Sequence, residues 1–254
     1  MKLKLSSLFI ALFFLTLFLF SCRSVSPYSS LITGRVDKSF AELEISEGVY
    51  VRRYETSNYE YNQFLKSIKL DNKALWESCK IDSTGWTVSP LNSKVLEGQY
   101  HWHPAYDNYP VLNVSYAAAN EYCKWLIKKY KHRKKDEKVK FRLPTEKEFM
   151  YLIETVVVKS NANNRKYFGE LKTDIISEAN VYACETSSYT EVVFKYIQNT
   201  QGFCSIIGNV SEFTSEGKIL GGSWNSLSGE TNKIDSNTLA NPSVGFRVVM
   251  EIFE

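Results

Sequence analysis

The sequence predicts a single folded domain that combines a few helices with short strands. Three segments before residue 160 have the apolar period of an amphipathic helix, and residues 244–249 have the valine-rich composition of a final strand. Between them the helical period disappears into short pieces punctuated by glycine, asparagine and serine. No internal repeat or second linker divides the chain. We therefore expect a signal segment at 1–21, a tether at 22–40 and one domain at 41–254.

Residues 1–21 have the layout of a secretory signal. Lys2 and Lys4 precede an uncharged apolar run over residues 8–20, and this run is shorter than the roughly 20 apolar residues that a membrane span needs. The motif LFSC at residues 19–22 resembles the bacterial lipobox. That resemblance implies that the thiol of Cys22 carries an acyl chain such as palmitate and that Cys22 becomes the first residue of the mature protein.

This leader predicts where the protein is located. A lipid on Cys22 would hold the chain at a membrane of a bacterial cell envelope, with the serine-rich residues 23–40 as a flexible tether. Arg23, rather than an acid, follows the lipidated residue, and by analogy with enteric sorting it favours the outer membrane. We expect the domain to face the periplasm or the cell surface.

The composition excludes two broad classes of protein. At 44% hydrophobic residues the chain is too apolar to be disordered. The formal net charge is only +3, and two of the lysines leave with the signal. Because nucleic-acid-binding domains concentrate much more positive charge, we expect no nucleic-acid partner.

The first helix is expected after Ser57. Ser57 and Glu60 have the spacing of a capping box, in which each side chain bonds the backbone amide of the other residue. The apolar stripe that follows at helical spacing consists of Tyr61, Phe64, Leu65 and Ile68.

Two further helices are expected, one after Ser115 and one at Thr145, where Thr145 and Glu148 repeat the capping-box spacing. Cys123 falls on the apolar stripe of the second helix, so we expect a small buried side chain there rather than a reactive thiol. The two stripes are Ala119, Tyr122, Cys123 and Leu126, and Phe149, Leu152, Ile153 and Val156.

Six short motifs, in a fixed order, resemble the formylglycine-generating-enzyme (sulfatase-modifying factor) superfamily. They are YETSN at 54–58, YPVLNVSY at 109–116, RLPTE at 142–146, GFCSIIGNVSEFT at 202–214, GGSW at 221–224 and GFR at 245–247. The resemblance implies a compact α+β fold that is related to C-type lectins and has little regular secondary structure.

The catalytic thiols of that superfamily are missing. Members that oxidise a substrate cysteine have two cysteines shortly after the GGS motif, and Ser226 and Thr231 stand at the matching positions here. Soft sulfur binds Cu(I), and only a thiol forms a transient disulfide with a substrate thiol. No cysteine follows Cys204 in the chain. We therefore expect neither copper nor formylglycine chemistry.

A second enzymatic branch of the superfamily, the sulfoxide synthases, uses an iron ion held by three histidines. This chain has only His101, His103 and His132. His132 lies in the basic run KKYKHRKKDEKVK at 128–140, whose charge opposes a metal cation. We expect surface or packing roles for these histidines rather than an iron site.

A structural calcium ion is the metal that the resemblance does imply. Family members often bind Ca²⁺ around the GNVxE segment, and such hard oxygen donors suit that ion. Carried over to this chain, the ligands would be the carbonyls of Gly208 and Val210 and the carboxylate of Glu212, with Ser205 at the fourth position. The alternative is that Glu212 and Asn209 cap buried backbone amides.

A second calcium loop resembles the family at Asn180 and Val181, although we find no acidic partner for it in the sequence. Because the loss of ligand charge lowers calcium affinity, this loop is the weaker of the two predictions.

Three functions remain open, and the sequence favours the first, a non-catalytic lipoprotein that binds or scaffolds a protein partner in the envelope. Lipoproteins that resemble this superfamily serve in gliding-motility and type IX secretion assemblies. The second is a ligand- or glycan-binding display protein of the C-type-lectin kind, with contacts from Asn225, Asn232, Asn237 and Asn241. The third is an enzyme of the superfamily with altered chemistry.

Overall fold

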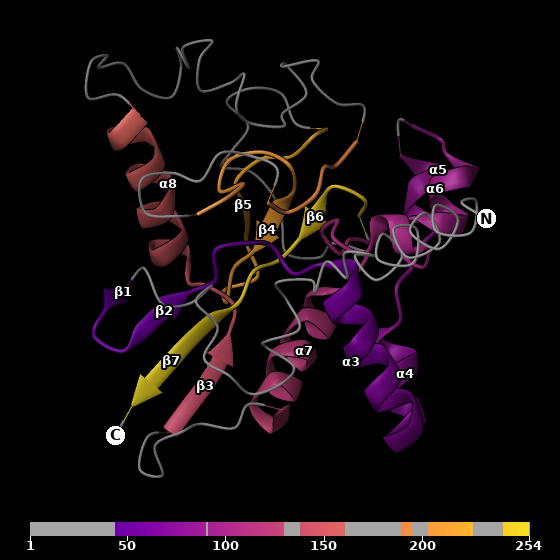
Figure 1. The fold of residues 1–254 in the computed structure, drawn as a ribbon, viewed down its shortest axis with the longest axis horizontal. Coiled ribbons are helices and arrows are strands. Elements are labelled where there is room, and N and C mark those ends of the chain that lie inside the picture. Colours follow the sequence, from indigo (N-terminus) through magenta and orange to yellow (C-terminus); the bar gives the residue numbers. More distant parts are fainter. Residues whose placement is uncertain are drawn as a thin grey trace, which may run out of the picture.

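The computed structural model describes residues 44–89, 91–129, 138–160, 189–194, 203–225 and 241–253. These residues form an α+β domain in which helices surround two small sheets (Figure 1). Within those ranges, no helix is both long and apolar enough to span a membrane.

The larger described sheet has four antiparallel strands in the order β1-β2-β7-β3. Its strands are β1 (Glu44–Ser46), β2 (Val49–Val51), β7 (Val249–Phe253) and β3 (Lys138–Arg142). The smaller sheet has the order β5-β4-β6, with β5 (Ile219–Leu220) antiparallel and β6 (Val244–Gly245) parallel to β4 (Ser211–Phe213). The last strand of the chain therefore lies next to β2 and β3, so the larger sheet joins both ends of the domain.

The single final strand predicted over residues 244–249 is wrong. The chain instead leaves the smaller sheet after β6 and enters the larger sheet at β7. Between the two strands, the carbonyls of Phe246 and Val248 accept hydrogen bonds from the amides of Thr56 and Arg52 at 2.8 and 3.0 Å. The backbone there bonds to the segment after β2 rather than to a neighbouring strand of either sheet.

The three predicted helices are present as α3 (Asn58–Asp71), α7 (Tyr116–Lys129) and α8 (Glu146–Ser160). The capping box of Ser57 and Glu60 is complete. The Thr145 hydroxyl accepts from the Glu148 amide at 3.2 Å, and the Glu148 carboxylate accepts from the Thr145 amide at 2.7 Å. The two predicted capping boxes are thereby confirmed.

Four short elements between α3 and α7 have no counterpart in the prediction. They are α4 (Lys73–Cys79), α5 (Gly85–Val88), α6 (Lys94–Gln99) and the 3₁₀ turn η1 (Pro104–Tyr106). Elements of seven residues or fewer show too little of the helical period to be detected. Side-chain caps are nevertheless present, since Asn72 caps α4 and Ser93 caps α6.

The four-stranded sheet lies between two hydrophobic clusters because side chains alternate along each strand. Val49, Val51 and Val249 join the cluster that includes the buried face of α8. Phe141 and Met250 join the cluster that includes α3 and α7. Figure 1 shows α7 and α8 on opposite sides of this sheet. The predicted stripes of the first two helices are buried as expected, and Val156 is the one stripe residue whose side chain lies outside the described set.

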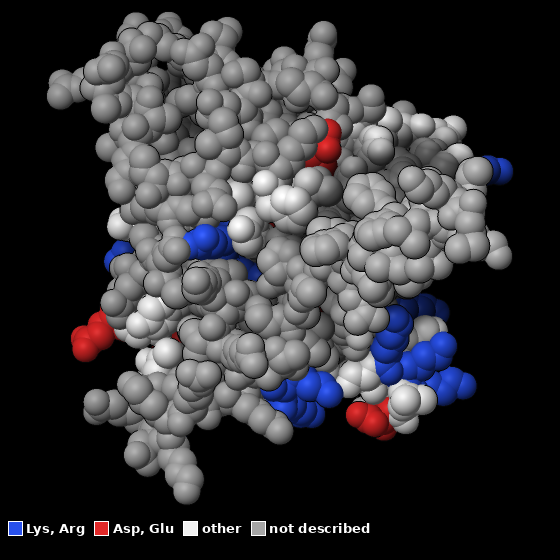
Figure 2. All heavy atoms as spheres, in the orientation of Figure 1, with Lys and Arg blue, Asp and Glu red and all other residues white. Residues whose placement is uncertain are grey.

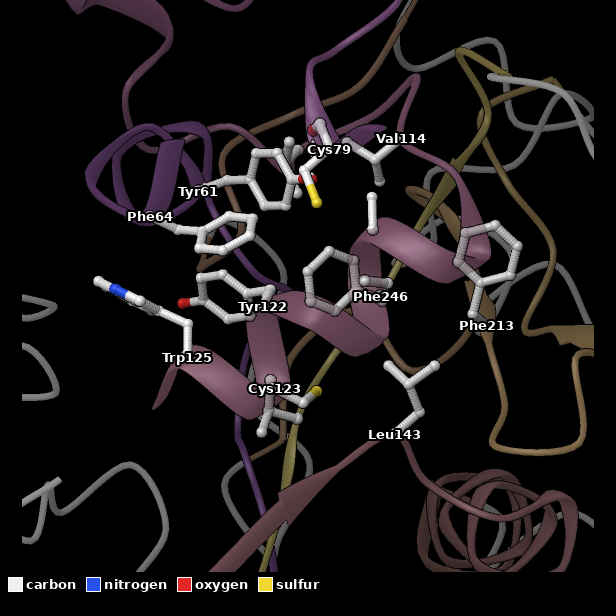
Figure 3. Packing of buried hydrophobic residues seen from close by; sticks show 14 of the residues in the cluster. Tyr61, Phe64, Cys79, Val114, Tyr122, Cys123, Trp125, Leu143, Phe213 and Phe246 are labelled. Carbon is white, nitrogen blue, oxygen red and sulfur yellow. Dashed lines mark hydrogen bonds between the residues drawn. The ribbon is translucent and has the colours of Figure 1, made fainter. Parts of the chain in front are cut away.

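Aromatic rings form the centre of the cluster between α3 and α7 (Figure 3). The ring of Tyr61 lies 5.3 Å from Phe64, 5.8 Å from Tyr122 and 6.2 Å from Phe246, measured between centroids. Such offset and edge-to-face pairs add to the free energy gained by burying the rings. Phe246 of the GFR motif is thus a core residue that joins the C-terminal segment to α3 and α7.

Candidate functional site

The motif residues converge on a buried ion pair between Arg247 and Glu212. The Nε and Nη2 atoms of Arg247 donate to the two carboxylate oxygens of Glu212 at 2.7 and 2.6 Å. Both side chains are fully buried. This two-point geometry is the strong form of a charge-assisted hydrogen bond.

The rest of the Arg247 guanidinium bonds to backbone carbonyls of two other segments. Nη1 donates to the carbonyls of Arg52 and Arg53, and Nη2 to those of Cys204 and Ser205, all at 3.2 Å. One side chain thereby connects the segment after β2, the loop before β4 and β4 itself. The loops of the motif region are held together from inside.

Two more buried polar residues extend this pair. The side-chain Nδ2 of Asn209 donates to Oε1 of Glu55 at 2.9 Å, and Oδ1 of Asn209 accepts from the backbone amide of Glu191 at 2.9 Å. Burial raises the pKa of Glu55 to about 8, and the nearby charge of Glu212 adds to this, while Arg247 opposes it. Glu55 is therefore largely protonated at neutral pH. We call Glu55, Asn209, Glu212 and Arg247 the polar hub.

Backbone geometry in the glycine motifs supports the hub. The Gly208 amide donates to the Gly221 carbonyl at 2.8 Å, which joins the GNV loop to the GGSW motif. Gly221 has φ +98°, and a Cβ there would lie 3.0 Å from the Ile206 carbonyl oxygen. This position therefore requires glycine.

Of the residues predicted to bind calcium, Glu212 and Ser205 both contact Arg247. Both Glu212 oxygens accept from Arg247, and the Ser205 carbonyl does so as well. The described part of the chain contains no group of three metal-ligating side chains. As placed here, Glu212 fits a guanidinium and not a calcium ion. Asn180 and Val181 lie outside the described residues, so calcium binding at that loop stays a prediction.

The alternative role for Asn209 and Glu212 is half right. Asn209 does cap a buried backbone amide, that of Glu191. Glu212 instead accepts from the side chain of Arg247. Glu55 and Arg247 lie within the YETSN and GFR motifs, but the sequence alone indicates no role for either residue. The signal that could have found them is a charged residue next to core residues, as in Phe246-Arg247-Val248, because such a charge needs a buried partner.

The described cysteines are buried and form no disulfide with one another. Cys123 lies in the core as predicted, and Cys79 and Cys204 are buried too. Burial raises the pKa of Cys123 and of Cys204 to about 12 and also raises that of Cys79. These thiols are therefore protonated at neutral pH and are poor nucleophiles and poor metal ligands.

The histidines that the structure describes have packing and surface roles. His101 is buried, with its ring nitrogens 3.2 Å from Asn58 Oδ1 and 3.3 Å from Asn113 Nδ2. His103 is exposed and accepts from the Ala105 amide at the start of η1. The two rings do not share an environment, although they are two residues apart. His132 lies outside the described residues.

Two of the four predicted ligand-contacting asparagines can be located. Oδ1 of Asn241 accepts from the Ser243 amide at 2.8 Å, and its carbonyl accepts from the Asn113 amide. The Asn225 amide donates to the Ser223 hydroxyl at 3.3 Å. Asn241 therefore has a structural role. Outside the described residues are Asn232, Asn237, Ser226, Thr231 and the predicted lipid site Cys22.

Comparison with known families decides the identity of the fold. The sequence profile of the sulfatase-modifying factor enzyme 1-like domain, FGE-sulfatase, matches residues 32–252. The chain belongs to this family. The FGE-like α+β fold predicted from the six motifs is thereby confirmed. No curated protein sequence matches the chain significantly.

Solved structures agree with this FGE-sulfatase assignment. CarF matches over 81% of this chain and 87% of its own, with a TM-score of 0.53 and 21% identity. PvdO from Pseudomonas aeruginosa covers 80% of each chain, with a TM-score of 0.55 and 19% identity. Treponema denticola variable protein 1 covers 80% of this chain and 84% of its own, with a TM-score of 0.51 and 16% identity. At these identities the likeness is one of fold.

Proposed function

We propose that this FGE-sulfatase domain is a non-catalytic binding or scaffold module of the cell envelope. The observation that carries the proposal is the state of its thiols. The three described cysteines are buried with raised pKa values, and the sequence has no cysteine after Cys204. Oxidation of a substrate cysteine needs accessible, ionisable sulfur for copper and for the substrate.

The geometry of the hub supports a binding role. Arg247 and Asn209 connect segments that are far apart in the sequence, so the loops around them have a rigid base. Rigid scaffolds that position loops are common in proteins that bind other molecules. The predicted lipid on Cys22 would hold this domain at the envelope, where we expect a protein partner, as in gliding-motility or type IX secretion assemblies.

The chemical part of the proposal is tested by anaerobic titration of the full chain with Cu(I), together with an assay of oxidation of a cysteine peptide. We expect neither tight copper binding nor product. The matched variant Ser226→Cys/Thr231→Cys restores thiols at the family positions and is expected to gain copper binding. Tight copper binding by the unaltered chain would contradict the proposal. Its loss in Cys204→Ala, or in a variant of Cys184, which lies outside the described residues, would identify the thiol responsible.

The scaffold part is tested by purifying the full chain from detergent-solubilised envelopes of the native host. We expect one or more envelope proteins to co-purify with the chain in constant ratio. When Cys22→Ser removes the predicted lipid, we expect the chain itself to be lost from the membrane fraction. Purification of a partner-free monomer would favour the ligand-binding display alternative. The altered-chemistry alternative has no described side-chain arrangement in its favour.

A further inference from the structure

A groove of about 390 Å³ runs along the outer side of α3. One wall is a stripe at helical spacing, formed by Tyr59, Gln63, Lys66 and Lys69. The opposite walls come from α4 and from residues 102–107. At a rise of 1.5 Å per residue the α3 stripe is about 15 Å long. The groove is thus long enough for several rings of an oligomeric ligand.

The groove is lined by more positive than negative charge. Lys66, Lys69 and Lys80 line it, against a single acid, Asp107. Figure 2 shows lysine side chains gathered over α3 and α4, at the lower right of that view. Lys80 pairs with Glu77 at 2.8 Å, but both side chains are about half exposed. Exposed pairs of this kind are weak, so an anionic ligand can compete for Lys80.

Indole rings lie among these ammonium groups. The Nζ atoms of Lys69 and Lys80 lie 5.0 and 6.0 Å from the ring centroid of Trp76, close enough for cation–π attraction. This contact helps to hold two positive charges at one point of the groove. On the other side Trp102 is 51% exposed, which is unusual for so large an apolar ring. Because Trp102 also lines the groove, its exposed part can pack against the apolar face of a ligand.

The geometry points to this groove as a binding site for an acidic polysaccharide. Carboxylate or sulfate groups of the sugar would contact Lys66, Lys69 and Lys80, and a ring face would stack on Trp102. Gln63 would bond to hydroxyl groups. A bilayer fits less well, because the cations and Trp76 line a recess rather than a protruding surface. None of the groove-lining residues belongs to the polar hub, so this inference is independent of whether the domain is an enzyme.

Calorimetric titration of the full chain with short oligogalacturonates at low ionic strength tests the site, with neutral galactan oligosaccharides as the reference ligand. We expect binding of the acidic ligand, weakened at least tenfold by Lys66→Gln/Lys69→Gln and by Trp102→Ala. The matched controls are Lys124→Gln/Lys128→Gln on α7 and Tyr151→Ala on α8, since none of these residues lines the groove. These controls are expected to stay within twofold of the unaltered chain.

Four outcomes would overturn the inference. The first two are no binding of oligogalacturonate by the unaltered chain, and binding of the neutral galactan with the same affinity. The third is a loss of affinity in the α7 control equal to that in the groove variants. The fourth comes from a parallel titration with nanodiscs that contain phosphatidylglycerol, if the chain binds these and not oligogalacturonate. Thermal melting of each variant accompanies the titration. A groove variant that melts with the unaltered chain but loses affinity supports the site. If one groove variant does not fold, the other still decides the result.

Discussion

Arg247 and Glu212 form a two-point ion pair in which neither side chain is exposed to solvent, and the same guanidinium also bonds to four backbone carbonyls. Removing two charges from water is costly, and here the cost is offset by bonds to every side of the guanidinium. The pair therefore determines how the segments around residues 52, 204 and 212 fit together.

Breaking this pair should strongly destabilise the domain. Arg247→Met or Glu212→Gln leaves an unpaired buried group, and we expect a loss of about 3–5 kcal/mol in the free energy of unfolding. Urea denaturation measures it. Glu121→Gln is the matched control, because Glu121 pairs with Lys124 at the surface and should change stability by less than about 1 kcal/mol. Equal effects of Glu212→Gln and Glu121→Gln would show that the buried pair contributes no more to the free energy of unfolding than a surface pair does.

Glu55 should make the domain less stable as the pH rises. Its folded pKa of about 8 lies above that of the unfolded chain, so the folded state binds the extra proton between about pH 5 and 8. Stability falls as that proton is lost. The free energy of unfolding of the unaltered domain should be lower at pH 8 than at pH 5 by an amount on the order of 1–3 kcal/mol, and Glu55→Gln should remove this difference. Denaturation curves of both proteins at these two pH values check it, and parallel pH profiles would contradict the assignment.

His101 should act in the opposite direction. Burial lowers its pKa to about 3, so the folded state keeps the ring neutral while the unfolded chain binds a proton below about pH 6.5. Stability should fall as the pH decreases from 6.5 towards 3. We expect the chemical shifts of the His101 ring protons to stay constant from pH 8 to 5. The free energy of unfolding of His101→Gln should vary less over that pH range than that of the unaltered chain. Titration of this resonance near pH 6 would show that the ring is accessible to water.

What the sequence could predict depended on how local the signal was. The caps at Ser57 and Thr145 and the stripe of α7 are contained within a few residues, and the structure has them as expected. The six motifs identified the fold in the same way. The α4 and α6 helices were missed because each is too short to show a period, although Asn72 and Ser93 cap them.

The candidate site depends on long-range contacts, which a single sequence does not reveal. Glu55 and Asn209 are 154 residues apart, and Arg247 and Glu212 are 35 apart. Nothing local to Glu212 distinguishes a calcium ligand from a partner of arginine, so the family resemblance suggested calcium. The groove was missed for a related reason, since Trp102 and the α3 lysines meet through the packing of a loop on a helix.

The glycines give the last prediction, because two of them differ in the space around Cα. At Gly221 a Cβ would lie 3.0 Å from the Ile206 carbonyl oxygen and 3.2 Å from the ring of Phe149, and φ is +98°. At Gly98, in α6, nothing lies within 4 Å of an added Cβ. Gly221→Ala should destabilise the domain by more than about 1 kcal/mol, because it combines strained backbone with a close contact. Gly98→Ala should be neutral or stabilise by up to about 1 kcal/mol, since alanine favours a helix. Urea denaturation of both variants checks the pair, and equal effects would mean that the loop around Gly221 relaxes freely and that the GGSW motif is not required for a rigid hub.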